Sequence, residues 1–353
     1  MNEDMNIGAM LSEQLERLFA REVNAALWSG AEDGRFAAAL WRQTEEIGVY
    51  GALVAEDDGG AGLAWADIEA LLRVGGRYAA PIPMGETMIA NWALSRAGLA
   101  LPDGPLAVSG AIWNIDSDGL VSGGDGLVAW LPQCGYLLLV ARGAQGDVLC
   151  LFETAQLQVE PLATFERTPS GAVALNHLKP LHAAPAHGLG PLGLQPHLAA
   201  LRSVQMAGLL DAILALCVEY GNTRIQFGKA IGKFQAIQHM IAELAGHAAA
   251  AQVAGLYACR QIDSGDAARA EFGAAVAKTR LGSAATRASA IAHQVFGAIG
   301  VTDEHQLHYL TRRLWQWRAE AGSEHAWSEW LGRASIAAGG AALWEKLAAH
   351  AQA

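Results

Sequence analysis

The pattern of hydrophobic and polar positions divides the chain into three zones. In the first zone, residues 1–100, hydrophobic residues recur at the spacing of an amphipathic helix, as at Leu15, Leu18 and Phe19. A glycine-rich stretch at 57–62 interrupts this pattern, and we expect a break between helices there. The first zone therefore predicts an N-terminal helical domain.

The middle zone, residues 101–187, contains short hydrophobic runs separated by Asp, Gly, Gln and Pro. This spacing predicts a small β domain, a barrel or sandwich of five to seven strands. The last zone, residues 188–353, is rich in alanine and predicts an antiparallel helical bundle. Its expected helices cover residues 197–220, 232–263, 266–296, 303–319 and 324–350. The predicted fold is thus an α+β multidomain chain in the order helical, β and helical.

Charge and hydropathy narrow the possible functions. The chain has 353 residues with 24 basic and 35 acidic side chains, so its formal charge at pH 7 is −11. This charge gives no electrostatic reason to bind nucleic acid or anionic lipid, and we expect neither partner. No stretch approaches the ~20 uninterrupted hydrophobic residues of a membrane span, and the N-terminal residues lack the features of a signal peptide. We therefore expect no association with a membrane.

Hydrophobic residues make up 52% and charged residues 17% of the chain. Because about 25% charged residues is usual, this balance predicts extensive buried surface, including contacts between subunits. The four cysteines are scattered and form no C-x-x-C pair. This is typical of reduced core residues in a cytoplasmic protein, and we expect no metal site.

Residues 224–239, R-I-Q-F-G-K-A-I-G-K-F-Q-A-I-Q-H, hold the most informative motif. We expect a helix to end near Tyr220, a short polar turn to follow, and hydrophobic residues from Phe234 onward to share one helical face. The guanidinium of Arg224, beside this turn, is able to bind an anion through two parallel hydrogen bonds. Spacing alone favours a simpler interpretation, in which the turn is an ordinary helix connection and the arginine is solvated.

This motif resembles the signature of the acyl-CoA dehydrogenases, R-x-Q-F-G-x-x-I-x-x-F-Q-x-I-Q-H. A second block, at 294–304, resembles the family's Q-x-x-G-G-x-G-x-x-x-E pattern, with Ala298 in place of its second glycine. The N-terminal zone is also similar to the family, at 45–62 and 79–83. The resemblance covers nearly the whole chain and implies the same order of domains.

The resemblance implies a flavoenzyme that acts on acyl-CoA. In the family, a carboxylate removes the α-proton of the thioester and the β-hydrogen leaves as hydride to FAD. The product is a trans-2-enoyl-CoA, and a separate electron-accepting flavoprotein takes the electrons. Positions that touch the FAD of a neighbouring subunit correspond here to Arg224, Gln226, Phe227, Ile231, Phe234 and Gln235. Positions near its adenosine and diphosphate correspond to Gln294, Gly297 and Gly300, and the predicted FAD-binding set also includes Ala298 and Ser323.

The catalytic base is where the sequence departs from the family. Many members carry the base in a Y-E-G-T motif, and counting without gaps places Ala321 at the base position. A methyl group cannot accept a proton. Glu320 is adjacent and is the candidate base, if a shift of the local backbone brings its carboxylate within hydrogen-bond reach of the substrate. Other members carry the base on an earlier helix, but the corresponding window, 197–202, contains no carboxylate.

The middle zone departs from the family as well. The T-E-P-x-x-G-S-D segment has no counterpart, and residues 127–129 replace the W-I-T element that backs the flavin ring; nearby Trp130 is a candidate substitute. Two hypotheses remain. The chain is an FAD-dependent acyl-CoA dehydrogenase active as a homo-oligomer, or it is a non-catalytic subunit that completes the FAD site of a paralogous partner in a hetero-oligomer. A flavin oxidase or a nitroalkane-type relative is a weaker third alternative.

Overall fold

The computed structural model describes residues 7–340, and these residues form two compact units. The first unit comprises the chain up to Gly75 together with Ala80–Leu198. The second unit comprises Gly76–Ala79 and the chain from Ala199 onward. The predicted N-terminal helical zone and the predicted β zone therefore share one compact unit, while nearly all of the third zone forms the other.

Helices build the N-terminal part of the first unit, as the hydrophobic spacing predicts. Leu15, Leu18 and Phe19 lie on the buried face of the first helix. At the predicted break, Gly59 and Gly62 have φ values of +84° and +61°, a left-handed conformation that glycine adopts without steric cost. The elements are α1 (Ile7–Glu22), α2 (Ala25–Glu32), α3 (Ala38–Glu46), η1 (Val49–Gly51), η2 (Glu56–Asp58), α4 (Trp65–Arg77) and α5 (Met84–Arg96).

Seven strands form one sheet in the order β5-β6-β2-β1-β3-β4-β7, a number within the predicted range. The pair β1 and β3 is parallel, and the other neighbouring pairs are antiparallel. Both edge strands, β5 and β7, are short and contain a proline, which limits pairing with further strands. The strands are β1 (Leu106–Ile115), β2 (Val121–Ala129), β3 (Tyr136–Gly143), β4 (Gly146–Glu153), β5 (Val159–Leu162), β6 (Ser170–Leu178) and β7 (His182–Pro185).

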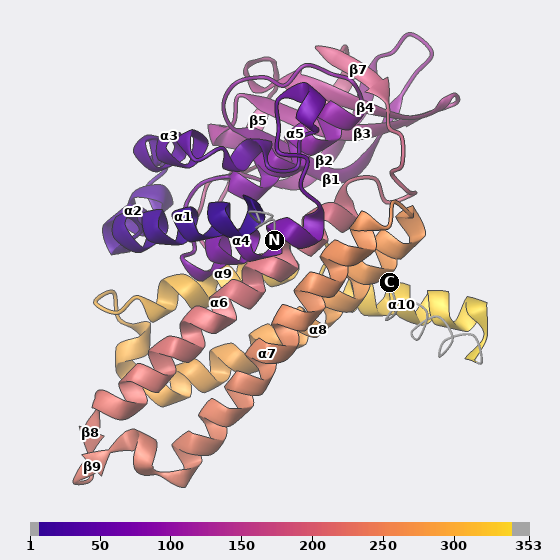
Figure 1. Ribbon diagram of the computed structural model, residues 1–353. Helices are drawn as coiled ribbons and strands as arrows, with labels where there is room; N and C mark the ends of the chain where they lie inside the picture. Colours follow the sequence, from indigo (N-terminus) through magenta and orange to yellow (C-terminus); the bar gives the residue numbers. More distant parts are fainter. Residues whose placement is uncertain (1–6, 341–353) are drawn as a thin grey trace, which may run out of the picture. The chain divides into compact units, whose positions relative to one another are not determined.

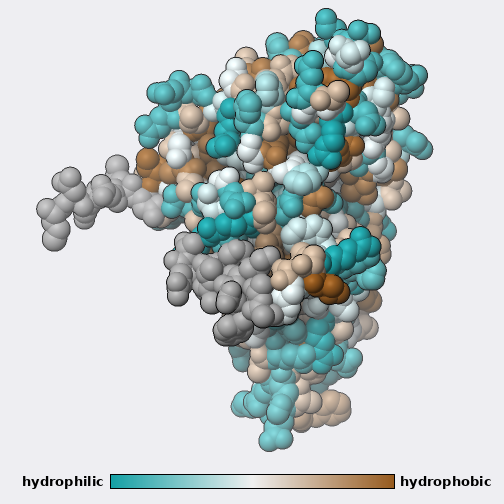
Figure 2. Space-filling view, turned by 90° about the vertical axis from the view of Figure 1, so that its right-hand side faces the viewer, coloured by the Kyte–Doolittle hydropathy of each residue, from teal (hydrophilic) through white to brown (hydrophobic). Residues whose placement is uncertain are grey.

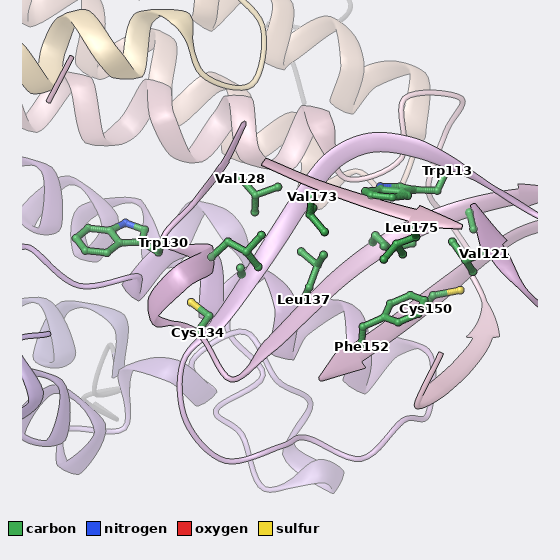
Figure 3. Close-up of a cluster of buried hydrophobic side chains, with 14 residues drawn as sticks. Trp113, Val121, Val128, Trp130, Cys134, Leu137, Cys150, Phe152, Val173 and Leu175 are labelled. Atoms are coloured by element: carbon green, nitrogen blue, oxygen red, sulfur yellow. The ribbon is translucent and has the colours of Figure 1, made fainter. Parts of the chain in front are cut away.

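A hydrophobic core lies against this sheet. Figure 3 shows side chains from several strands meeting there, with the rings of Trp113 and Phe152 among them. Both of these aromatic side chains are completely buried. Burial of hydrophobic area on this scale is the main stabilising contribution to the first unit.

Long helices form the second unit, which confirms the predicted helical C-terminal zone. Helices α7 and α8 pack against each other along much of their length (Figure 1). Buried alanines such as Ala248 and Ala251 on α7 leave room for this close approach. The helices are α6 (Gln195–Thr223), α7 (Gln235–Asp263), α8 (Ala267–Phe296), α9 (Leu307–Ala319) and α10 (Glu324–Ala338), with η6 (Gly297–Val301) between α8 and α9. The last predicted segment, 324–350, runs beyond the described residues.

Helix α6 is long and hydrophobic enough to cross a membrane by composition alone. However, 67% of its most hydrophobic 18-residue window is buried inside the protein, which is typical of a core helix. On the face drawn in Figure 2, strongly hydrophobic residues lie in small separate groups among hydrophilic ones. Scattered hydrophobic residues of this kind are normal on protein surfaces.

Candidate functional site

The predicted polar turn is a two-stranded hairpin at the far end of α6 and α7 (Figure 1). Its strands are β8 (Ile225–Gln226) and β9 (Lys229–Ala230). Phe227 and Gly228 at the tip both have positive φ, at +52° and +80°, the pattern of a tight hairpin turn. This conformation costs a side-chain-bearing residue about 1–2 kcal/mol, and Phe227 is nevertheless 90% exposed. Burial of the Phe227 side chain does not offset the cost of its positive φ. Strain of this kind is typical of functional sites, so it indicates a function for the hairpin tip.

Two glycines allow the turn to fold back against α6. A Cβ atom on Gly232 would lie 2.8 Å from the carbonyl oxygen of Gly221, so only glycine permits this approach. The backbone of Arg224 is fixed at both ends, because its N–H donates to Tyr220 O at 2.9 Å and its carbonyl accepts from Ile231 N at 2.9 Å. The side chain of Arg224 therefore starts from a well-defined position.

A cavity of about 680 Å³ lies between the hairpin, the start of α7 and the end of α8, entirely within the second unit. Its lining residues are Tyr220, Arg224, Gln226, Phe227, Ile231, Phe234, Ala236, Ile237, Gln294, Val295, Phe296, Gly297, Ala298 and Ile299. Eight of the eleven predicted FAD-binding residues are among them. The two family motifs, which are far apart in the sequence, thus meet at one cavity.

Three predicted residues do not line this cavity. Gln235 begins α7 and is exposed, and Gly300 is buried within η6. Ser323 is the N-cap of α10, where its hydroxyl accepts the amide N–H of Ala326 at 3.3 Å. For these residues, as for the eight that line the cavity, a role in FAD binding stays a prediction.

The chemistry of the cavity suits an anion attached to a flat or hydrophobic group. No acidic side chain lines it, whereas the guanidinium of Arg224 and the side-chain amides of Gln226 and Gln294 supply hydrogen-bond donors. The side chain of Arg224 is exposed and forms no ion pair with the described residues. Most of the remaining wall is hydrophobic, and a few polar groups in such a wall are typical of cofactor sites. The donor set therefore fits the diphosphate of FAD.

Sequence reasoning missed an aromatic stack beside the cavity. The rings of Tyr220 and Phe296 lie 4.3 Å apart at an interplanar angle of 23°, and the ring of His305 lies 4.5 Å from that of Phe296. Tyr220 precedes Arg224 by one helical turn, a spacing that places both on the same side of a helix. That spacing was the signal by which Tyr220 could have been found. No sequence pattern indicated that Phe296 of α8 and His305 of the following loop stack beside it.

The predicted base position lies in the turn between α9 and α10. Helix α9 ends at Ala319, as the sequence predicts, and Glu320 follows it in an extended conformation, with φ −66° and ψ 150°. Ala321 and Gly322 both have positive φ, at +53° and +92°. The indole N–H of Trp327 donates to Ala321 O at 2.8 Å and helps to hold this unusual backbone.

A buried lysine fastens the same turn from α8. The Nζ of Lys278 donates to the carbonyl oxygens of Trp317 and Glu320, at 2.6 Å and 2.7 Å, and to that of Arg318 at 3.1 Å. Burial lowers the pKa of Lys278 to about 7, although the negative charge of Glu320 opposes the shift. The turn that carries the base position is therefore strongly held, although it carries no base at Ala321.

The carboxylate of Glu320 is engaged inside the protein. One oxygen accepts from Arg202 Nε at 2.6 Å and the other from Gln316 Nε2 at 3.0 Å. The side chains of Arg202 and Glu320 are only 4% and 5% exposed. Arg202 also donates to Gln205 Oε1 at 2.6 Å and lies over the ring of Trp317. Glu320 does not line the cavity and forms a closed ion pair with an arginine from the helix where other family members carry the base.

Comparison with known proteins identifies the family. Residues 8–100 match the description "Acyl-CoA dehydrogenase, N-terminal domain", and residues 197–338 match "Acyl-CoA dehydrogenase, C-terminal domain". The chain is 29% identical over 314 residues to acyl-CoA dehydrogenase IpdE2 of Mycobacterium tuberculosis, an alignment that covers 86% of this chain and 89% of the relative. The chain belongs to the acyl-CoA dehydrogenase family.

Solved structures of acyl-CoA dehydrogenases share its fold. The Tcur3481–Tcur3483 steroid ACAD has a TM-score of 0.83 and 25% identity, and the match covers 94% of this chain and 99% of that chain. The ChsE4–ChsE5 complex from Mycobacterium tuberculosis has a TM-score of 0.85 and 20% identity, over 96% and 98% of the two chains. The predicted order of N-terminal helices, β sheet and C-terminal bundle is thus confirmed. Heteromeric complexes occur among these similar acyl-CoA dehydrogenases.

The first unit departs from the usual acyl-CoA dehydrogenase pattern where the sequence indicated. Trp130, the candidate replacement for the family's flavin-backing tryptophan, is only 6% exposed and belongs to the core of the sheet (Figure 3). Leu127, which the resemblance predicts to stand at the family's tryptophan position, is 37% exposed. Because Trp130 is packed among the core side chains, it has little surface left for contact with a cofactor ring.

Proposed function

We propose that the chain is a subunit of an FAD-dependent acyl-CoA dehydrogenase, and that its cavity binds the diphosphate side of an FAD shared with a neighbouring subunit. The observation that supports this is the convergence of the hairpin motif and the α8 motif on one cavity with a cationic donor and no acidic lining. Neither motif forms such a cavity by itself. An ordinary helix connection does not require this convergence.

Each group in the cavity has a definite task in this proposal. The guanidinium of Arg224 would hold the diphosphate as a charged donor, and the amides of Gln226 and Gln294 would add neutral donors. The exposed ring of Phe227, at the hairpin tip, would help to shield the bound cofactor from solvent. A bound FAD would supply the hydride acceptor for the β-hydrogen of an acyl-CoA, and a separate flavoprotein would take the electrons. All four cysteines are free and buried, in agreement with the cytoplasm as the proposed compartment.

A second candidate, a non-catalytic subunit, has a specific observation in its favour. Ala321 occupies the base position, and the carboxylate of the adjacent Glu320 is paired with Arg202. For Glu320 to act as base, this buried pair has to break and leave Arg202 without a counter-ion, which is costly. A paralogous partner chain then supplies the base. The heteromeric complexes among similar acyl-CoA dehydrogenases give this arrangement a precedent.

Substitution of Arg224 tests the proposed cavity. We expect Arg224→Ala to weaken FAD binding by the FAD-loaded assembly about tenfold to a hundredfold, because hydrogen bonds to a charged group contribute about 1.5–3 kcal/mol. The FAD affinity of Arg224→Lys should lie between those of Arg224→Ala and the wild type, since lysine keeps the positive charge but cannot form two parallel hydrogen bonds. Dissociation constants from flavin fluorescence measure this.

The matched control is Arg260→Ala. Arg260 is an exposed arginine near the other end of α7, and its removal should leave FAD affinity at the wild-type value. Equal affinity in the wild type and Arg224→Ala would show that the cavity is not the diphosphate site.

A further inference from the structure

The segment between α8 and α9 forms part of the cavity wall and depends on a histidine. Gly297, Ala298 and Ile299 of η6 line the cavity, and α9 begins a few residues later at Leu307. The N-cap residue Gln306 makes no side-chain capping hydrogen bond. Instead, the amide N–H of Leu307 donates to His305 Nδ1 at 3.1 Å. An imidazole therefore satisfies one of the free amides at the start of α9.

This hydrogen bond defines the protonation state of His305. A ring nitrogen that accepts a hydrogen bond carries no proton, so His305 is neutral with its proton on Nε2. His308 Nδ1 lies 2.7 Å from the carbonyl oxygen of His305, which only accepts, so His308 carries a proton on Nδ1. A second proton on His305 would set two donors against each other at Leu307. It would also place a positive charge at the positive end of the α9 dipole.

Contacts link this cap to the cavity wall. The ring of His305 packs against Phe296, which in turn stacks on Tyr220, and both aromatic residues line the cavity. Gly300 of η6 fits tightly against the same groups, because a Cβ there would lie 2.9 Å from Phe296 Cβ and 3.0 Å from a methyl carbon of Leu307. Movement of the α9 terminus therefore reaches η6 and the cavity directly.

The charged surroundings of His305 favour its neutral form. His308 lies on α9, and on α8 the Nε2 of His293 lies 3.0 Å from Thr311 Oγ1. Burial first, and then the charge of His308, lower the pKa of both His293 and His305.

The other titratable groups nearby do not offset this effect. Asp303 and Glu304, in the loop before His305, are exposed. Tyr220 of α6 lies behind the ring of Phe296, and Arg312 of α9 lies over the ring of Tyr309. A pH below the ordinary pKa of histidine therefore adds positive charge to three neighbouring imidazoles, those of His293, His305 and His308.

We propose that His305 is a pH-sensitive cap of α9, and that its protonation loosens η6 and so weakens the hold of the cavity on FAD. The second half of this proposal rests on the proposed function of the cavity. The first half concerns this chain alone and is measurable without cofactor. The direction is fixed, because the folded state favours the neutral ring and loses stability relative to the unfolded state as the pH falls below about 6.5.

Hydrogen–deuterium exchange of residues 297–312 tests the cap in the cofactor-free chain. After correction for intrinsic exchange, the protection factors of the wild-type amides in this segment should be about tenfold lower at pH 5.5 than at pH 7.5. His305→Asn keeps an acceptor that does not titrate in this range, so its protection should be equal at both pH values. His325→Asn, at an exposed histidine on α10, is the matched control and should behave like the wild type.

Release of FAD from the loaded assembly at the same two pH values tests the link to the cavity. We expect release to be about tenfold faster at pH 5.5 in the wild type and unchanged by pH in His305→Asn. Equal protection of the wild type at both pH values, or a loss of protection in His305→Asn at pH 5.5, would overturn the cap. A working cap without any effect of pH on FAD release would overturn the link. Absence of FAD at pH 7.5 with a working cap would instead contradict the proposed function.

Discussion

At the scale of single residues, Glu320 and Arg224 are opposite cases: the charge of Glu320 is neutralised inside the protein by Arg202, whereas the side chain of Arg224 is exposed. Arg224 and Phe227 belong to a motif with fixed offsets around one turn, so the sequence already placed them together. The partner of Glu320 was not predictable, because Arg202 is 118 residues away and their contact depends on how two helices pack. Sequence reasoning treated Glu320 as a candidate base beside an empty base position. In the structure, both oxygens of its carboxylate accept hydrogen bonds inside the protein.

At this scale, we expect Glu320→Gln to destabilise the protein strongly. Loss of the carboxylate leaves the buried guanidinium of Arg202 without a counter-ion, and breaking a buried pair in this way costs about 3–5 kcal/mol. The free energy of unfolding from urea denaturation measures the effect. Joint replacement, Arg202→Met with Glu320→Met, should recover most of the loss because neither the guanidinium nor the carboxylate is then buried without the other.

The control for this prediction is Glu329→Gln. Glu329 forms an exposed pair with Arg333, and such pairs contribute at most about 1 kcal/mol. Flavin reduction by acyl-CoA separates the two roles of Glu320 in the assembled enzyme. A Glu320→Gln protein that stays as stable as the wild type but no longer reduces flavin would show that Glu320 is the base.

At the scale of elements, the long helices were predicted within a few residues of their ends, because hydrophobic spacing over many turns is a strong signal. The connections were less accurate. The segment expected to be helical from 303 begins only at Leu307. The 3-10 helix η6 and the loop that carries His305 lie between α8 and α9. The β8–β9 hairpin was expected only as a polar turn. Its two-residue strands are too short to produce an alternating pattern.

Lys278 connects α8 to the end of α9 and should give the protein a distinctive dependence on pH. Its pKa is about 7 in the folded protein because of burial, whereas an unfolded lysine keeps its proton to about pH 10.4. Between these values the unfolded state binds more protons, so stability should rise with pH.

Lys278→Met should remove this contribution. From pH 7.5 to 9.5, the free energy of unfolding of the wild type should rise relative to the variant by up to about 1.4 kcal/mol per pH unit. Urea denaturation at several pH values measures the difference. Lys233→Met, at an exposed lysine beside the hairpin, should follow the wild type. A difference between wild type and Lys278→Met that is constant with pH would show that the lysine stays charged throughout.

At the scale of the whole molecule, the order of helical and β zones followed from changes in hydrophobic period alone. The grouping of the first two zones into one compact unit did not, because the contacts between α5 and β1 join residues that carry no shared periodic signal. Assembly is likewise only partly encoded in a single chain. The chain keeps Arg224, which its resemblance to the family predicts to reach a neighbouring subunit's FAD, and it has no counterpart of the T-E-P segment expected on its own flavin side.

This asymmetry leads to a prediction about the purified protein. Expressed alone, the chain should contain little FAD, because the buried Trp130 and the missing T-E-P segment leave its own flavin side incomplete while Arg224 has no partner cofactor to bind. Expressed together with a paralogous acyl-CoA dehydrogenase, it should co-purify in a hetero-oligomer whose flavin absorbance falls when Arg224→Ala is introduced into this chain only. Arg260→Ala in the same complex should keep the flavin. A full complement of FAD and turnover of an acyl-CoA by the chain alone would instead establish the homo-oligomeric enzyme. For Glu320 to act as the base in that enzyme, its ion pair with Arg202 would have to break during the reaction.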